Sequence, residues 1–176
     1  MGCAKGLDGR YARLVAPPVI VQEVPAESRT DLVSLVDQSF DGIYRWHARK
    51  TLREVRWVRR AAREERAIGL IMLTTLTPDL GYVYYVAVLP AERGAGIGAL
   101  LLDDAMAALR AVGAREVLAC IRSENLPSIR LFRAKGFERI RFRDLVRDRG
   151  FWDAARLWAG MVVAPGEGVF HTVVRG

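Results

Sequence analysis

Cysteine is scarce in this chain of 176 residues, so we expect no disulfide framework to stabilise it. The two cysteines are Cys3, in a segment rich in glycine that we expect to be a tail, and Cys120, in an apolar segment where we expect a small buried residue. No stretch has the pattern of a signal peptide, and no apolar run reaches the roughly 18 residues of a membrane helix. We therefore predict a soluble, cytoplasmic protein without a membrane partner.

Histidine is equally scarce, since the chain has only 2. Neither His47 nor His171 has cysteine or carboxylate neighbours at the spacing of metal ligands, so no metal site is predicted. We interpret both as structural or exposed side chains.

Lysine is rare too: only 3 of the 27 basic residues are lysine, yet the net charge is +7. An excess of positive charge suits an anionic cofactor, an acidic partner or a nucleic acid. It is also compatible with a merely solvated basic surface. The charge alone does not choose among these partners.

Hydrophobic periodicity predicts the elements of secondary structure. We expect strands over 19–24, 55–60, 66–76, 81–89, 116–122, 137–143 and 154–163, and helices over 28–40, 43–52, 98–112 and 127–135. Residues 61–65 read as a polar connector between two strands of a hairpin, and the tail from Ala164 as a place where one more strand could form.

The segment around Val55–Arg60 has a second interpretation. If the preceding helix continued through it, six arginines at spacings of three and four would form one basic stripe, namely Arg45, Arg49, Arg53, Arg56, Arg60 and Arg63. We favour the strand, because the following apolar segment looks like its hairpin partner.

Hairpins followed by crossover helices indicate an α/β fold with a mixed, mostly antiparallel sheet flanked by helices. The length suits one domain. We expect a flexible N-terminal arm over 1–17, a single domain over 18–163, and a C-terminal extension over 164–176.

The loop Arg93-Gly94-Ala95-Gly96-Ile97-Gly98 lies between the strongest predicted strand and an amphipathic helix. A helix N-terminus presents unpaired N–H groups and the positive end of the helix dipole. Glycines let the backbone approach a bulky anion closely. The sequence therefore predicts a diphosphate site here. Gly94, Gly96 and Ala99 also fit a dinucleotide fingerprint, but the hairpins upstream fit poorly with the parallel unit that this fingerprint requires.

Two motifs resemble those of the GNAT superfamily of N-acetyltransferases. The first is Val88-Leu89-Pro90 followed by Arg93, Gly96 and Gly98; the second comprises Asn125, Ser128, Leu131-Phe132 and Lys135-Gly136-Phe137. The resemblance implies the GNAT fold, acetyl-CoA as acyl donor, and direct attack of an acceptor amine on the acetyl carbonyl. The cofactor-binding residues that it implies are Val86, Ala87, Val88, Arg93, Gly94, Ala95, Gly96, Ile97, Gly98, Ala99, Asn125, Ser128 and Phe132.

The chain departs from the family pattern at the catalytic positions. Phe132 stands where many members have the tyrosine assigned as general acid, and Ser128, one helical turn earlier, is a candidate replacement. Tyr82 occupies the position of a common glutamate base, and Tyr84 shares its strand face. These departures keep open a non-catalytic acyl-CoA-binding or regulatory module.

The basic stretch 45–66 carries interleaved aromatic residues, Tyr44, Trp46 and Trp57, which suits recognition of an acidic acceptor or of nucleic acid. A solvated face with tryptophan in the core explains the same pattern. The acceptor amine stays unidentified, as a small amine or a protein, and both a monomer and a homodimer fit the sequence.

Overall fold

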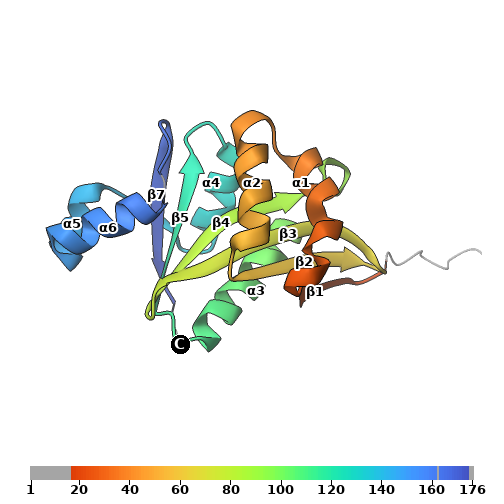
Figure 1. The fold of residues 1–176 in the computed structure, drawn as a ribbon, viewed down its shortest axis with the longest axis horizontal. Helices are drawn as coiled ribbons and strands as arrows, with labels where there is room; N and C mark the ends of the chain where they lie inside the picture. Colours follow the sequence, from red (N-terminus) through yellow and green to blue (C-terminus); the bar gives the residue numbers. More distant parts are fainter. Residues whose placement is uncertain (1–16, 162, 175–176) are drawn as a thin grey trace, which may run out of the picture.

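The computed structural model describes residues 17–161 and 163–174, which form a seven-stranded sheet flanked by helices (Figure 1). The strands are β1 (Val19–Glu23), β2 (Trp57–Arg63), β3 (Arg66–Thr77), β4 (Leu80–Val88), β5 (Glu116–Arg122), β6 (Glu138–Ile140) and β7 (Glu167–Val173), in the spatial order β1-β2-β3-β4-β5-β7-β6. Only β4 and β5 pair in parallel; every other neighbouring pair is antiparallel. The predicted mixed, mostly antiparallel sheet is confirmed.

The basic segment after α2 (Gly42–Glu54) is a strand, so the continuous helical stripe of arginines does not form. β2 pairs with β1 on one side and with β3 on the other. The expected connector over 61–65 was too long, because β2 continues to Arg63 and only Glu64 and Glu65 form the turn. Ala61 and Ala62 are buried, so their small side chains belong to the core.

Helices cover both faces of the sheet (Figure 1). The 3-10 helix η1 (Ala26–Leu32), α1 (Val33–Ser39) and α2 lie on one face, and α3 (Ile97–Ala111) and α4 (Leu126–Ala134) on the other. α3 packs closely on β3 and β4 because glycine faces it from both strands. A Cβ at Gly69 would lie 3.0 Å from a Leu101 methyl, and one at Gly81 would lie 2.8 Å from a Leu109 methyl.

Of the predicted strands, the one over 137–143 was too long and the one over 154–163 was wrong, because helices occupy these residues. β6 covers only three residues of the stretch 137–143, and α5 (Phe142–Arg149) begins where the Asp144 carboxylate accepts the Arg141 N–H and caps the helix. Residues 154–161 of the stretch expected as a strand over 154–163 belong to α6 (Phe151–Met161). Its buried residues Ala154, Leu157 and Met161 recur at spacings of three and four, which is the helical period.

The tail expected as a C-terminal extension contributes β7, which lies between β5 and β6. β7 pairs with β5 along its whole length and buries Val169 and Phe170. The arm predicted over 1–17 lies almost entirely outside the described residues.

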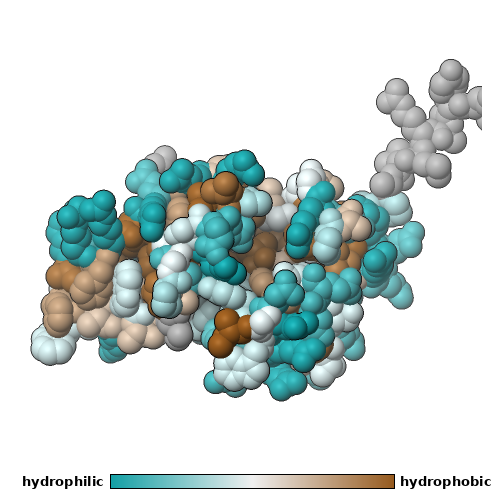
Figure 2. Space-filling model, turned by 90° about the horizontal axis from the view of Figure 1, so that it is seen from above, coloured by the Kyte–Doolittle hydropathy of each residue, from teal (hydrophilic) through white to brown (hydrophobic). Residues whose placement is uncertain are grey.

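The α5–α6 pair projects at one end of the molecule, where Figure 2 shows hydrophobic residues beside hydrophilic ones. Within the described ranges, no helix is long and apolar enough to cross a membrane.

Candidate active site

The site is built around a gap in the middle of the sheet. β4 and β5 pair only from Leu80↔Glu116 to Val83↔Ala119, and beyond these residues the two strands no longer pair with each other. Side-chain burial changes at the same point, because Leu80–Val83 are buried whereas Tyr84, Tyr85 and Val86 are half-buried. A central strand that loses its neighbour leaves N–H and C=O groups without ladder partners. The carboxyl half of β4 is therefore an internal edge open to an extended ligand.

A β-bulge in β4 shapes this opening. Met72 of β3 pairs with Tyr85 and Leu73 with Val83, so Tyr84 is the extra residue. Its ring packs edge-on against Tyr82 with 4.6 Å between ring centroids, and Tyr85 packs against Phe40, the residue that follows α1, at 5.0 Å. The bulge thus turns two successive tyrosines toward one face, the face that carries α1 and α2.

The main chain beyond the bulge points into the gap. The Leu89 N–H donates to the Ile68 carbonyl of β3 at 3.0 Å, so by alternation along an antiparallel ladder the groups of Val86 and Val88 point away from β3. Ala87 is buried between them. These are the main-chain positions expected to bind the pantetheine arm.

The glycine loop lies at the N-terminus of α3, next to the open half of β4. Gly94 and Gly96 have φ of 83° and 79°, which side chains with a Cβ rarely adopt, and a Cβ at either would have no protein atom within 4 Å. The first helical bond runs from the Leu100 N–H to the Gly96 carbonyl, and no side chain caps the helix. The preceding N–H groups of Ile97, Gly98 and Ala99 therefore have no partner within the helix.

Neighbouring contacts hold the loop in place. The Arg93 Nε donates to the Val88 carbonyl at 3.2 Å, and Ala95 is exposed at the tip. A Cβ at Gly98 would lie 3.2 Å from a Leu131 methyl, so this glycine lets α3 approach α4. N–H groups without a helical partner at the positive end of a helix fit a diphosphate.

The second motif forms the start of α4. The Asn125 Oδ1 accepts the Ser128 N–H at 3.2 Å, so this asparagine caps the helix. Ser128 is half-buried. Phe132 is only 3% exposed and packs edge-on against Phe137 at 4.9 Å, so its ring is part of the core.

One group of functional interest was missed by sequence reasoning. The Glu167 carboxylate, at the start of β7, accepts the Tyr44 hydroxyl at 3.1 Å and the Ala164 N–H at 3.0 Å. Its charge, after burial, raises the pKa of Tyr85 and of Tyr44. The carboxylate thus lies on the tyrosine face of the gap. The sequence offered a weak signal, a glutamate between two glycines in a segment expected to be an extension.

His47 of α2 also faces this side of the gap. Its Nδ1 lies 2.8 Å from the Tyr85 hydroxyl and 3.3 Å from the Thr51 hydroxyl. It was interpreted as structural or exposed, and the structure places it beside the predicted site.

Comparison with known proteins agrees with this geometry. The family model described as acetyltransferase (GNAT) family matches residues 23–137, which is more than half of the chain. The chain belongs to the GNAT acetyltransferase family.

Curated GNAT relatives include longer proteins. A mycothiol acetyltransferase of Saccharomonospora viridis is 26% identical over 140 residues, which are 66% of this chain and 44% of the relative. An uncharacterized protein of Mycobacterium leprae is 31% identical over 133 residues, which are 72% of this chain and 36% of the relative. The chain spans less than half the length of these two relatives.

Solved structures share the fold. An acetyltransferase of the GNAT family from Staphylococcus aureus has a TM-score of 0.68 at 12% identity, covering 90% of this chain and 100% of that one. The PaiA N-acetyltransferase of Thermoplasma acidophilum, solved with coenzyme A, has a TM-score of 0.66 at 12% identity, covering 89% and 99%. The strand–loop–helix unit is thus part of the GNAT fold.

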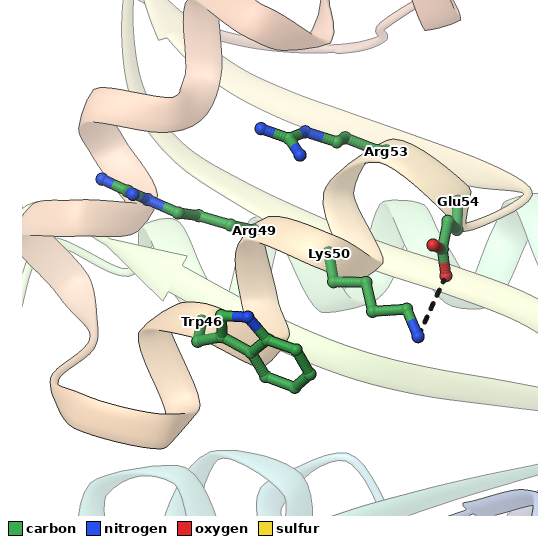
Figure 3. Close-up of a pocket in the computed structure, with 5 residues that line it drawn as sticks. All are labelled: Trp46, Arg49, Lys50, Arg53 and Glu54. Carbon is green, nitrogen blue, oxygen red and sulfur yellow. Dashed lines mark ion pairs between the residues drawn. The ribbon is translucent and has the colours of Figure 1, made fainter.

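The basic stretch does not form one continuous charged surface in this GNAT domain. Arg49 pairs with Asp37, Arg59 with Asp104, and Arg63 with Glu92. Trp46 is exposed and lines a shallow hollow on α2 with Arg49, Lys50, Arg53 and Glu54 (Figure 3). Lys50 and Glu54 pair across it at 4.0 Å. This hollow is on the outer side of α2, and the comparisons give no support to a nucleic-acid-binding or nicotinamide-dependent function.

Tyr82 offers a direct test of the catalytic residues expected from sequence. It is 2% exposed, and its hydroxyl donates to the Met161 carbonyl of α6 at 3.4 Å. Burial raises the pKa of Tyr82 well above its ordinary value, and burial likewise raises the pKa of Tyr84. A phenol that keeps its proton at neutral pH cannot accept one.

We expect Tyr82→Phe to keep nearly all turnover, because the lost hydroxyl contacts only buried groups, the Met161 carbonyl of α6 and the Cys120 thiol of β5. The cost should be about 1 kcal/mol of stability, the usual net worth of one hydrogen bond. Steady-state kinetics and thermal unfolding measure both effects. A fall in kcat of about 100-fold or more, the effect of losing a general base, would restore Tyr82 as a catalytic residue.

Proposed function

We propose that the protein is an N-acetyltransferase that moves the acetyl group of acetyl-CoA to a primary amine. The observation that carries this proposal is the open half of β4 beside the glycine loop. Together they offer a helix end for a diphosphate and an unpaired strand edge for an extended amide chain. Acetyl-CoA carries both groups.

Different residues would bind different parts of acetyl-CoA. N–H groups of Ile97, Gly98 and Ala99 would bind the diphosphate, and the main chain of Val86 and Val88 would bind the pantetheine arm. Bound acetyl-CoA supplies an acetyl group activated as a thioester. A Val86 N–H aimed into the gap would stabilise negative charge on the acetyl oxygen.

The acceptor approaches from the opposite face of the sheet. The glycine loop begins α3, whereas Tyr84, Tyr85 and Glu167 face the side of α1 and α2. Donor and acceptor thus reach one gap from two sides. This arrangement supports direct attack by the amine and orients the two reactants relative to each other. Phe132 has no proton to donate, so the departing thiolate must receive its proton from Ser128 or from water.

The test is release of the CoA thiol from acetyl-CoA in the presence of primary amines. The panel holds ethylamine, tyramine, spermidine, glucosamine and a peptide with a free N-terminus. We expect release that depends on the amine, together with an acetylated product in the mass spectrum. Acetyl-CoA without amine is the control. Equal release with and without every amine would contradict the proposal.

A further inference from the structure

We propose that the Glu167 carboxylate binds the acceptor ammonium group and takes its proton, making this glutamate the catalytic base of the reaction. The inference rests on the proposed acetyl transfer to an amine and adds the group that prepares this amine. Neither tyrosine proposed as the base can do so: Tyr82 is buried, and Tyr84 keeps its proton because burial raises its pKa.

Two hydrogen bonds hold the Glu167 carboxylate in place, and it can accept further ones. Its Oε1 accepts the Tyr44 hydroxyl at 3.1 Å and its Oε2 accepts the Ala164 N–H at 3.0 Å. A carboxylate offers about four lone-pair directions, so one remains on each oxygen. The side chain is half-buried. Glu167 therefore combines a defined position with capacity for a further donor such as an ammonium group.

Its position in the sheet brings it to the gap. In the β5–β7 ladder Glu167 pairs with Arg122, and Val169 with Cys120. Cys120 in turn lies beside Tyr82, whose pKa its proximity helps to raise. Strand β7 thus directs Glu167 toward the same face as the tyrosines of β4. The half of β5 that no longer pairs with β4 ends at Arg122, opposite Glu167.

The titratable groups that face Glu167 keep their protons, so Glu167 is the group among them that can accept one. Burial, with a smaller effect of the Glu167 charge, raises the pKa of Tyr44, of Tyr82, of Tyr85 and of the Cys120 thiol, the last to about 11. All four keep their protons at neutral pH. The Arg122 guanidinium lies over the Tyr44 ring at 4.8 Å and forms an ion pair with Glu124. The Glu124 carboxylate, the other acidic group nearby, is therefore already paired with a cation.

His47 is the competing base on this face. Its Nδ1 is already engaged by the Tyr85 and Thr51 hydroxyls, at 2.8 and 3.3 Å. That contact orients the Tyr85 ring. We assign His47 a positioning role, and the test below separates it from Glu167.

The proton and electron balance is simple. The acceptor ammonium gives one proton to Glu167 and becomes a neutral amine. Its nitrogen lone pair forms the C–N bond, the C–S bond breaks, and that electron pair stays on sulfur. The second nitrogen proton leaves for solvent as the amide forms. The thiolate takes a proton from water, or from Ser128, which then regains one from solvent, and Glu167 releases its proton to solvent.

The experiment compares Glu167→Gln with wild type, using ethylamine and tyramine as probes. Glutamine keeps the size of the side chain and an oxygen for the Tyr44 hydroxyl, but it accepts no proton. We expect kcat to fall about 10²–10⁴-fold, the usual effect of losing a general base, with acetyl-CoA affinity unchanged. The pH profile of kcat/KM should lose one limb. Glu167→Asp, which retains the charge, should keep part of the activity and covers the case in which the glutamine variant misfolds.

Glu65→Gln, at the exposed turn between β2 and β3, is the matched control and should behave as wild type. Tyr44→Phe should reduce kcat less than Glu167→Gln, because the base stays in place but loses one positioning bond. Two results would overturn the inference. One is a kcat of Glu167→Gln within about threefold of wild type; the other is that His47→Gln, and not Glu167→Gln, shows the large fall in kcat expected on losing a general base. Absence of turnover in wild type itself would overturn the proposed function, which is a separate result.

Discussion

Gly96→Glu is expected to weaken acetyl-CoA binding by at least about 100-fold, or ~2.8 kcal/mol. Two physical effects add up. Gly96 has φ of 79° at the N-cap of α3, so any side chain strains the turn that presents the N–H groups. A carboxylate would also stand where the diphosphate is expected and repel it. Because a Cβ at Gly96 meets no protein atom within 4 Å, the fold itself has room for the change.

Gly113→Glu is the matched control, because it lies just past the opposite end of α3. Gly113 has φ of 96°, and a Cβ there would make only an ordinary contact with the Pro78 carbonyl at 3.8 Å. Both variants should lose about 1–2 kcal/mol of stability from the left-handed backbone. Only Gly96→Glu should lose binding by calorimetry. Equal affinity of the two variants would mean that the loop does not hold the diphosphate.

Phe170→Ala is expected to destabilise the domain by about 3–5 kcal/mol, the usual cost of removing a buried aromatic ring. Phe170 is 2% exposed in β7, where it pairs with Ala119 of β5 and packs in the main core. Such a loss is a large part of the 5–15 kcal/mol that typical domains have. Denaturant unfolding followed by circular dichroism measures it.

Val173→Ala, in the same strand, is the control. Val173 is 58% exposed, so we expect a change within about 0.5 kcal/mol. If both variants unfolded at the wild-type midpoint, β7 would contribute nothing to the core. The tail would then be an extension, as first expected.

The sequence predicted the strand–loop–helix unit well because local chemistry determines it. Gly94 and Gly96 adopt positive φ angles, which favour glycine. Pro90 indicates the end of the preceding strand, and the apolar face of α3 indicates the following helix. The β-bulge could not be foreseen. It depends on how Met72 and Leu73 of β3 register against β4, and that is a tertiary property.

The errors concentrate after Phe137. A short apolar stretch such as 154–163 fits a strand or a helix equally well until its length and capping are known. Because α6 was mistaken for a strand, the position of β7 in the sheet was not predicted. Glu167, which lies at the start of β7, was therefore not considered as a site residue. The residue that faces the gap is brought there by sheet order and by a hydrogen bond to Tyr44, 123 residues away in the chain.

Product analysis tests the central claim most directly. Protein shown to be folded is incubated with acetyl-CoA and the amine panel, and both CoA thiol and acetylated amine are quantified. We predict equal amounts of the two products with at least one amine, and no acetylated product with Gly96→Glu under the same conditions. Wild-type protein that binds acetyl-CoA but acetylates none of the amines would contradict the account and leave an acyl-CoA-binding module in its place.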